Sequence, residues 1–217
     1  VVKLYKLDIL HAHYAIPYAY AAFFAKQMLK EENADIPLVT TLHGTDITLV
    51  GQHPSYKHAV EFSINHSDKI TTVSESLKSD TLKFFKITKE IEVITNFIDN
   101  TEFEDLKTCQ RNHFANEDEK ILIHVSNLRP VKRIKDVLDI FNKVEKSVKS
   151  KLLILGDGPD VEVINEFINE NPHLINTIKL LGKVDNLYQI LKFADVFLLP
   201  SELESFGLAA LEALAAE

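Results

Sequence analysis

Two glutamates, Glu204 and Glu212, stand eight positions apart where a loop leads into a predicted helix. The apolar run before them, residues 195–199, ends at Pro200 and is typical of a buried parallel strand. The Ala- and Leu-rich stretch after them contains no helix breaker, so we expect a helix to begin near Phe206. Carboxylates at this edge of a sheet suit the recognition of hydroxyl groups. The plainer alternative is a solvated loop glutamate followed by a surface helix glutamate.

Cations follow an earlier predicted strand, residues 121–125, in the string Ser126-Asn127-Leu128-Arg129-Pro130-Val131-Lys132-Arg133. Arginine binds phosphate oxygens as a fork and lysine binds them as a point charge, so Arg129 and Lys132 suit a departing diphosphate. Pro130 prevents an earlier helix start and keeps Arg129 in the loop. A solvated helix start is the alternative, although cations at the amino end of a helix oppose its dipole.

Histidines mark the strand ends of the first half of the chain. His43 follows the predicted strand 38–42 in the string Thr41-Leu42-His43-Gly44-Thr45-Asp46. A histidine there can orient a substrate or transfer a proton, or it is merely satisfied by local hydrogen bonds. His11 and His13 share one face of a strand and form a weak zinc candidate with His43, because no carboxylate or cysteine pattern accompanies them.

Two further motifs are less informative. Gly156-Asp157-Gly158-Pro159 fails as a dinucleotide fingerprint because Val161 occupies the third glycine position, so a tight turn before a helix is the better interpretation. The backbone near Val184 follows the next strand and lies where it could pair with a base edge. No nucleophile elbow, Walker loop or Cys-x-x-Cys pair is present, so nucleophilic catalysis has no support.

Composition excludes several classes of protein. The 217 residues include 24 Lys and Arg against 32 Asp and Glu, for a net charge of −8, and 46% are hydrophobic. That content suits one large or two small folded domains. The scattered cations argue against nucleic acid or an anionic membrane as a partner, and no apolar run approaches the ~20 residues of a membrane span. A single cysteine, Cys109, excludes an internal disulfide and fits a cytoplasmic location.

Short apolar strands alternate with longer helical patterns, which predicts parallel sheets wound with helices. Two sets are visible. The first has strands near 8–12, 38–42, 69–73 and 92–95 and helices near 18–30, 55–65 and 76–85. The second has strands near 121–125, 151–155, 177–181 and 195–199 and helices near 133–148, 161–169, 187–193 and from 206 onward. The first set shows no exposed apolar or basic amphipathic helix that would dock on a membrane.

The polar stretch between the sets predicts a domain boundary. We therefore expect domains at residues 1–95 and 121–217, joined by a hinge and linker at 96–120. The chain has no initiator Met, and its carboxyl end stops in mid-helix. We expect a fragment in which both domains are incomplete and which is inactive by itself.

Four strings together resemble the family 4 glycosyltransferases of the GT-B fold: His11-Ala12-His13-Tyr14-Ala15-Ile16-Pro17, Leu42 through Asp46, Ser126 through Arg133, and Glu204 through Glu212. The resemblance covers most of the chain. It implies an α/β fold of two Rossmann-like parallel-sheet domains facing a cleft, and a metal-independent enzyme that retains configuration. The last two strings are strong evidence for the family, whereas the first two are weaker evidence.

Carried over by position, the resemblance implies that Arg129 and Lys132 hold a UDP diphosphate and that Glu212 holds the ribose hydroxyls. Glu204 and the amides of Phe206, Gly207 and Leu208 would hold the transferred sugar. Asn127, Val184 and Ser205 would complete the donor site. His43 would lie beside the reacting centre, and Tyr14 and Thr41 would line the acceptor site.

Two departures from the family pattern stand out. Asn127 occupies the place where the family has an arginine, so Arg129 must reach in from two positions later. The glycine-rich loop that follows the family's first strand would precede Val1.

The implied reaction moves N-acetylglucosamine from UDP-N-acetylglucosamine to the hydroxyl of L-malate, the first step of bacillithiol biosynthesis, without a cofactor or metal. Nucleic acid and membrane are not expected partners, and a homo-oligomer is left open. The alternatives are another donor or acceptor (inositol phosphate, a lipid or a glycan), a retaining glycosidase, and a non-catalytic nucleotide-sugar binder.

Overall fold

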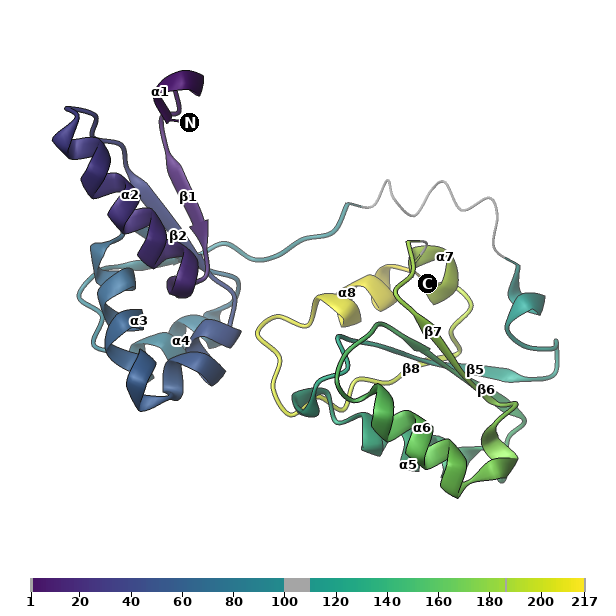
Figure 1. Ribbon diagram of the computed structural model, residues 1–217. Helices are drawn as coiled ribbons and strands as arrows, with labels where there is room; N and C mark the ends of the chain where they lie inside the picture. Colours follow the sequence, from purple (N-terminus) through teal and green to yellow (C-terminus); the bar gives the residue numbers. More distant parts are fainter. Residues whose placement is uncertain (1, 100–109, 186, 217) are drawn as a thin grey trace. The chain divides into compact units, whose positions relative to one another are not determined.

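The computed structural model describes residues 2–99, 110–185 and 187–216, and the chain divides into two compact units, Val1–Asn96 and Phe97–Glu217 (Figure 1). Each unit is built on a four-stranded, entirely parallel sheet. The predicted pair of Rossmann-like α/β units is therefore confirmed. The assignment of 96–120 as hinge and linker stays a prediction, and Cys109 lies outside the described residues.

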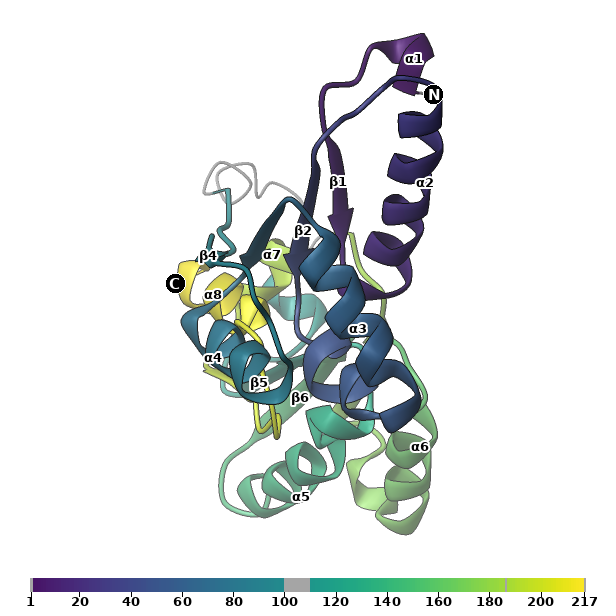
Figure 2. The same ribbon diagram turned by 90° about the vertical axis from the view of Figure 1, so that its left-hand side faces the viewer.

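The first sheet has the strand order β1-β2-β3-β4, so each strand lies beside the next one in the chain. Its elements are α1 (Val2–Tyr5), β1 (Leu10–His13), the irregular turn η1 (Ala15–Ala19), α2 (Tyr20–Glu31), β2 (Leu38–Leu42), η2 (Thr45–Leu49), η3 (Val50–Gln52), α3 (Pro54–His66), β3 (Lys69–Thr72), α4 (Glu75–Phe84) and β4 (Ile91–Val93). Figure 2 shows α2 and α3 beside the strands of this unit.

The two faces of this first sheet differ in character because side chains alternate along a strand. Ala12, Leu38 and Leu42 are buried, and Ala12 and Leu38 pack with Ala19 and Phe23. His11 and His13 alternate with Ala12 along β1 and are exposed. The strands thus direct apolar residues into the core while histidines occupy the other face.

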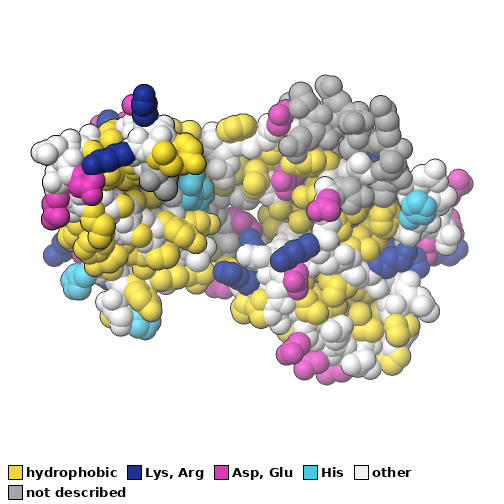
Figure 3. Space-filling view, turned by 45° about the horizontal axis from the view of Figure 1, so that its top comes forward, with side chains coloured by type: hydrophobic (Ala, Val, Ile, Leu, Met, Phe, Trp, Pro, Cys, Tyr) yellow, Lys and Arg dark blue, Asp and Glu magenta, His cyan; other side chains and the backbone are white. Residues whose placement is uncertain are grey.

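Helix α2 exposes an apolar stripe, in contrast to the expectation from the sequence that the first set lacks an exposed apolar helix. Tyr20, Phe24 and Met28, spaced four residues apart, are 39%, 45% and 68% exposed. Figure 3 shows hydrophobic side chains gathered over the first unit on the face in view. The expectation failed because Ala- and Phe-rich helical patterns look alike whether the apolar face is covered or open.

The second sheet has the order β7-β6-β5-β8. Its elements are η5 (Arg111–His113), β5 (Lys120–Val125), η6 (Pro130–Lys132), α5 (Ile134–Val144), β6 (Ser150–Leu155), α6 (Val161–Glu170), η7 (Pro172–Leu174), β7 (Ile178–Gly182), α7 (Leu187–Leu191), β8 (Val196–Phe197) and α8 (Leu208–Ala215). The predicted strand 195–199 is thus shorter than expected, and the last helix begins two residues after Phe206.

Each face of the second sheet has its own core. Leu122, Leu152 and Ile154 pack with residues of α5 and α6, including Phe141 and Phe167. The alternate strand positions Ile121, Ile123, Leu153 and Leu155 pack with residues of α7 and α8. Figure 1 shows α5 and α6 on one face of this sheet and α7 and α8 on the other. The helices change faces because the chain runs from β5 outward to β7 and then returns across the sheet to β8.

That return places β5 and β8 side by side at the point where strand order reverses. In open α/β sheets ligands bind outside the carboxyl ends of the strands at such a switch point. The two strings that carry Arg129, Lys132, Glu204 and Glu212 follow these two strands. The topology therefore brings both strings to one edge of the second sheet.

Candidate active site

The loop after β5 is tightly held by its neighbours. Leu128 is fully buried with a positive φ of 41°, its N–H donates to Ser126 Oγ at 3.1 Å, and its carbonyl accepts from the Asp160 N–H at 2.9 Å. A Cβ on Gly156 would meet the Ser126 carbonyl oxygen at 1.8 Å, and one on Gly158 would meet the Asn127 carbonyl oxygen at 2.1 Å. The glycines of the Gly-Asp-Gly-Pro turn therefore serve close packing against the β5 loop.

Arg129 and Lys132 emerge from this held loop. Arg129 has extended backbone angles and lies in the loop, as the sequence predicts, just before the 3₁₀ turn η6. The side chain of Arg129 is exposed, whereas that of Lys132 is 19% exposed and contacts Glu204, with Nζ 2.6 Å from Oε1. The Glu202 N–H also donates to the Val131 carbonyl at 2.9 Å. The β5 and β8 loops are therefore joined by two contacts, which confirms that they meet.

Glu204 lies in a loop and Glu212 lies within α8, as predicted. Between them, Gly207 precedes the helix with φ +83°, and a Cβ there would meet no atom within 4 Å. The backbone at this helix start is therefore open to an approaching ligand. Ser205 and Phe206 lie in the preceding loop, partly exposed, and Leu208 is the first helical residue.

Glu212 has a partner that the sequence does not reveal. Tyr188 in α7 donates its hydroxyl to Glu212 Oε1 at 3.3 Å. Val184, also after β7, packs its partly buried side chain against the α7 and α8 core. The carboxylates of Glu204 and Glu212 thus have different neighbours, a lysine and a tyrosine.

His124 is a buried polar residue beneath this edge of the sheet. Its ring is fully buried in β5, with Nδ1 2.9 Å from the Leu198 carbonyl oxygen and Nε2 2.8 Å from Ser126 Oγ. Burial lowers the pKa of His124, and the charge of Lys132 lowers this pKa further, while the Leu198 carbonyl and Glu204 oppose the change. Sequence analysis missed His124 because a lone histidine in an apolar strand gives no motif.

Ser201, just after Pro200, offers a second polar group at this edge. Its Oγ is buried and has no hydrogen-bond partner within the parts of the chain that the structure describes. A buried hydroxyl without a partner is costly unless something else binds it.

The first unit holds a connected histidine cluster. His13 Nδ1 lies 2.8 Å from His43 Nε2, and the Tyr14 ring is 4.9 Å from the His43 ring, between centroids. His11 Nε2 lies 2.8 Å from Thr41 Oγ1, which is also 2.7 Å from Thr71 Oγ1. The structure thus brings the predicted acceptor residues to one edge of the first sheet, although Thr41 already bonds His11 and Thr71.

Asp46 holds the backbone next to two residues of this cluster, Tyr14 and His43. Its side chain is buried, with Oδ2 accepting from the Ala15 N–H at 2.7 Å and Oδ1 accepting from the Gly44 N–H at 3.1 Å. Burial raises the pKa of Asp46, and these backbone donors oppose the change. Burial also lowers the pKa of His43, reinforced by His13 and opposed by Asp46. Asp46 joins the loops after β1 and β2.

The three histidines do not form a metal centre. His13 and His43 bond each other, and His11 bonds Thr41. Among residues 2–99, 110–185 and 187–216, no group of three or more His, Cys, Asp or Glu could hold a metal ion.

The same residues include no helix that is long and apolar enough to cross a membrane.

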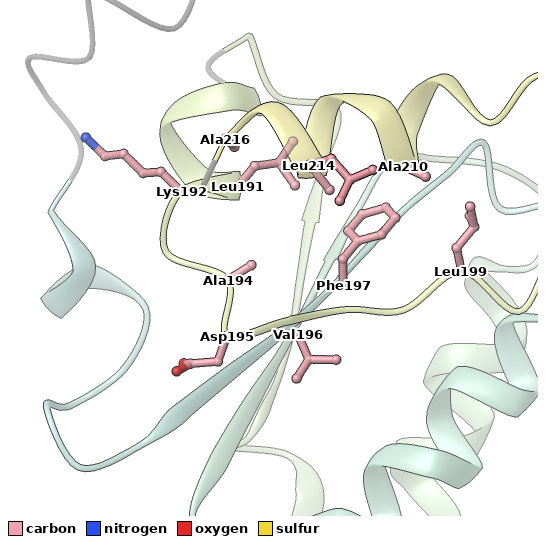
Figure 4. Close-up of a pocket in the computed structure, with 11 residues that line it drawn as sticks. Leu191, Lys192, Ala194, Asp195, Val196, Phe197, Leu199, Ala210, Leu214 and Ala216 are labelled. Carbon is pink, nitrogen blue, oxygen red and sulfur yellow. The ribbon is translucent and has the colours of Figure 1, made fainter.

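A hollow of about 520 Å³ lies elsewhere on the second unit. Figure 4 shows it between β8 and α8, with Phe197, Ala210 and Leu214 among its lining residues. None of the predicted donor residues lines it. The predicted donor residues therefore lie outside this hollow.

Family comparisons cover both units. Residues 107–217 match the family model described as glycosyl transferases group 1, and residues 1–102 match the model described as Glycosyltransferase Family 4.

Individual proteins agree with the family matches. The chain is 45% identical over 217 residues to the N-acetyl-alpha-D-glucosaminyl L-malate synthase of Bacillus anthracis, covering 99% of this chain and 56% of that protein. It is 38% identical over 104 residues to the alpha-monoglucosyldiacylglycerol synthase of Acholeplasma laidlawii, covering 46% of this chain and 25% of that protein. The chain thus spans little more than half the length of the first of these relatives.

A solved structure shows the same fold. Anabaena HepE in complex with UDP and glucose aligns with a TM-score of 0.78 at 18% identity, over 99% of this chain and 58% of that one. The GT-B fold predicted from the sequence is confirmed.

Proposed function

Because this chain belongs to the glycosyl transferases of group 1 and family 4, we propose that the complete protein moves N-acetylglucosamine from UDP-N-acetylglucosamine to the hydroxyl of L-malate. The observation that carries the proposal is the joining of the two donor loops through Lys132 and Glu204 at the switch point of the second sheet. The malate synthase of Bacillus anthracis supports the choice of donor and acceptor through 45% identity. Family membership favours transfer over glycosidic hydrolysis.

In the proposed donor site, Arg129 and Lys132 bind the diphosphate and Glu212 binds the ribose. Charged donors aimed at the leaving group stabilise the negative charge that develops as its bond to the sugar breaks. Tyr188 holds the Glu212 carboxylate through a hydrogen bond, which favours one orientation for ribose recognition. The open backbone at Gly207, with Phe206 and Leu208 beside it, suits the hydroxyls of the transferred sugar.

The proposed reaction is a front-face substitution. The acceptor hydroxyl attacks C1 of the sugar on the side from which UDP leaves, so the new bond has the configuration of the old one. The proton of the acceptor leaves with the departing diphosphate or passes to His43, whose lowered pKa keeps it neutral and able to accept a proton near neutral pH. Tyr14 and Thr41 are the further acceptor-side residues.

A lipid acceptor is the second candidate. The stripe Tyr20, Phe24 and Met28 on α2 is exposed, and the related Acholeplasma enzyme is by its name a synthase of a glycolipid. The first unit lacks an arginine in the proposed acceptor cluster, which removes one common way of holding malate carboxylates. Product analysis must therefore include both kinds of acceptor.

The test is mass spectrometry of the products formed by the full-length protein. UDP-N-acetylglucosamine and UDP-glucose are each offered with L-malate, inositol phosphate and diacylglycerol vesicles. N-acetylglucosaminyl malate as the main product supports the proposal. Glycosylation of inositol phosphate or lipid, with none of malate, would overturn the proposed acceptor and leave the family assignment intact.

We also propose a cytoplasmic location, which the single cysteine supports.

A further inference from the structure

His124 connects the loop after β5 to the segment after β8, and these two segments carry the proposed donor site. It lies in β5, two residues before Ser126, and its ring reaches the carbonyl of Leu198, which follows β8. Ser126 Oγ in turn accepts from the Leu128 N–H in the loop that leads to Arg129 and Lys132. A single fully buried ring therefore joins the start of the β5 loop to the end of the β8 strand.

The partners of the ring fix a hydrogen on Nδ1 and suit a bare Nε2. The Leu198 carbonyl can only accept, so Nδ1 must carry a hydrogen. Ser126 Oγ accepts from the Leu128 N–H and can donate its own hydrogen to a bare Nε2, while its second lone pair can accept from a protonated Nε2. The arrangement is satisfied by a neutral ring in the Nδ1–H form. An added proton on Nε2 would turn the Ser126 hydroxyl away from its acceptor.

The charged groups that influence the ring are Lys132 and Glu204, the pair that the two loops present. They act in opposite directions on the pKa of His124, while burial lowers it. The ring is thus held neutral mainly by its enclosure, and a change in its protonation would be transmitted to the loops that carry both charges.

We propose that His124 is a positioning residue whose neutral Nδ1–H ring holds the β5 and β8 loops in the register that lets Lys132 and Glu204 receive a nucleotide sugar. The inference rests on the proposed function of the donor site. It adds a specific dependence on pH, because protonation of His124 reverses the hydrogen bond between Ser126 and Nε2 and places a positive charge in a fully buried site near Lys132.

The test measures UDP-N-acetylglucosamine binding to the full-length protein by calorimetry between pH 7.5 and 5. Both phosphates of this probe stay ionised over that range, so a loss of affinity reflects protonation of the protein and not of the ligand. We expect wild-type affinity to fall as the pH drops below the ordinary histidine value. His124→Phe removes two hydrogen bonds and is expected to weaken binding about tenfold at pH 7.5.

His124→Asn provides a milder variant. Its amide nitrogen can take the place of Nδ1 and keep the bond to Leu198, but it does not titrate. We expect affinity between those of wild type and His124→Phe, with a flat pH profile. His173→Asn is the matched control, since His173 is an exposed histidine of the same unit that bonds only Asn142 among the residues described. This control is expected to keep the wild-type affinity and profile.

Nitrogen NMR of the His124 ring in the wild-type protein gives a readout that does not depend on the variants folding. A hydrogen on Nδ1 and a bare Nε2 at pH 6.5 is expected. An Nε2–H ring, or a charged one, would overturn the proposal. So would roughly wild-type affinity with an unchanged pH profile in His124→Asn. If wild type and His173→Asn both fail to bind the probe at any pH, the proposed function itself is wrong.

Discussion

Lys132 Nζ lies 2.6 Å from Glu204 Oε1, so the two side chains proposed to bind the diphosphate and the sugar neutralise each other. Both are mostly buried, at 19% and 28% exposed. A donor must therefore separate them, with its phosphates competing for the lysine and its hydroxyls competing for the carboxylate. The pair joins the two loops, and donor binding would have to break one ion pair.

Replacing either cation is expected to slow the reaction. Lys132→Ala and Arg129→Ala should each lower turnover by about 10²–10³-fold, because each supplies preorganised charge to the departing diphosphate. Steady-state kinetics of the full-length protein measure the effect. Lys135→Ala is the control, since Lys135 pairs with Asp139 on the exposed side of α5. Turnover within roughly threefold of wild type for both site variants would contradict the assignment.

Substitutions of the two glutamates are expected to affect different parts of the donor: Glu212 the ribose of UDP, and Glu204 the transferred sugar. Glu212→Ala should weaken UDP itself, because the ribose contact does not need a sugar. Glu204→Ala should spare UDP or tighten it, since the variant releases Lys132 from its ion pair, and should damage the sugar-dependent step. Titration with UDP and with UDP-N-acetylglucosamine distinguishes the two. An equal loss of UDP affinity in both variants would show that the roles are wrongly divided.

Tyr188→Phe serves as an intermediate case for Glu212. It removes the hydroxyl that bonds the carboxylate and leaves the ring in place. We expect a smaller loss of UDP affinity than in Glu212→Ala, because the carboxylate remains but is less well oriented.

Local pattern was enough to predict the alternating elements and the edge of each sheet at which the polar strings lie. β2 spans Leu38–Leu42 as expected, and Arg129 lies in the loop before Pro130. Contacts between distant parts of the chain could not be predicted in this way. The Lys132–Glu204 pair joins residues 72 positions apart, and it depends on β8 returning beside β5.

The sequence also did not identify the buried polar residues that hold the loops in place. His124 and Asp46 sit in apolar or turn sequences where nothing marks them as hydrogen-bonded supports, and each is identified only by the backbone groups that surround it. The exposed stripe of α2 was missed for the opposite reason: its sequence looks like a core face, and only the packed structure reveals which side is open.

Removal of divalent ions is expected to leave activity intact. We propose that Arg129, Lys132 and the start of α8 stabilise the charge of the leaving group, so we expect that no metal is required. Initial rates of the full-length protein are compared with and without excess EDTA, and with added Mg²⁺ or Mn²⁺. A strict and reversible requirement for either ion would overturn this expectation.

Stability of the full-length protein is expected to fall as the pH drops from about 7.5 towards 5.5. The pKa of His43 is lowered by burial and by His13, and that of His11 is lowered by burial and by His13. Unfolded histidines take up protons near pH 6.5, whereas these folded ones do so only at lower pH. The unfolded state therefore binds more protons in this window, and the free energy of unfolding decreases as the pH falls.

The bond between His13 and His43 sharpens the same prediction. Nδ1 of one and Nε2 of the other lie 2.8 Å apart, so one nitrogen must be bare, and full protonation would place two N–H groups against each other. His43→Asn should give a shallower decline, measured as the change in free energy of unfolding by urea between pH 7.5 and 5.5. His58→Asn, in the same unit with a 93% exposed side chain, is the control. An equally steep decline in His43→Asn and in this control would show that the cluster does not set the pH dependence.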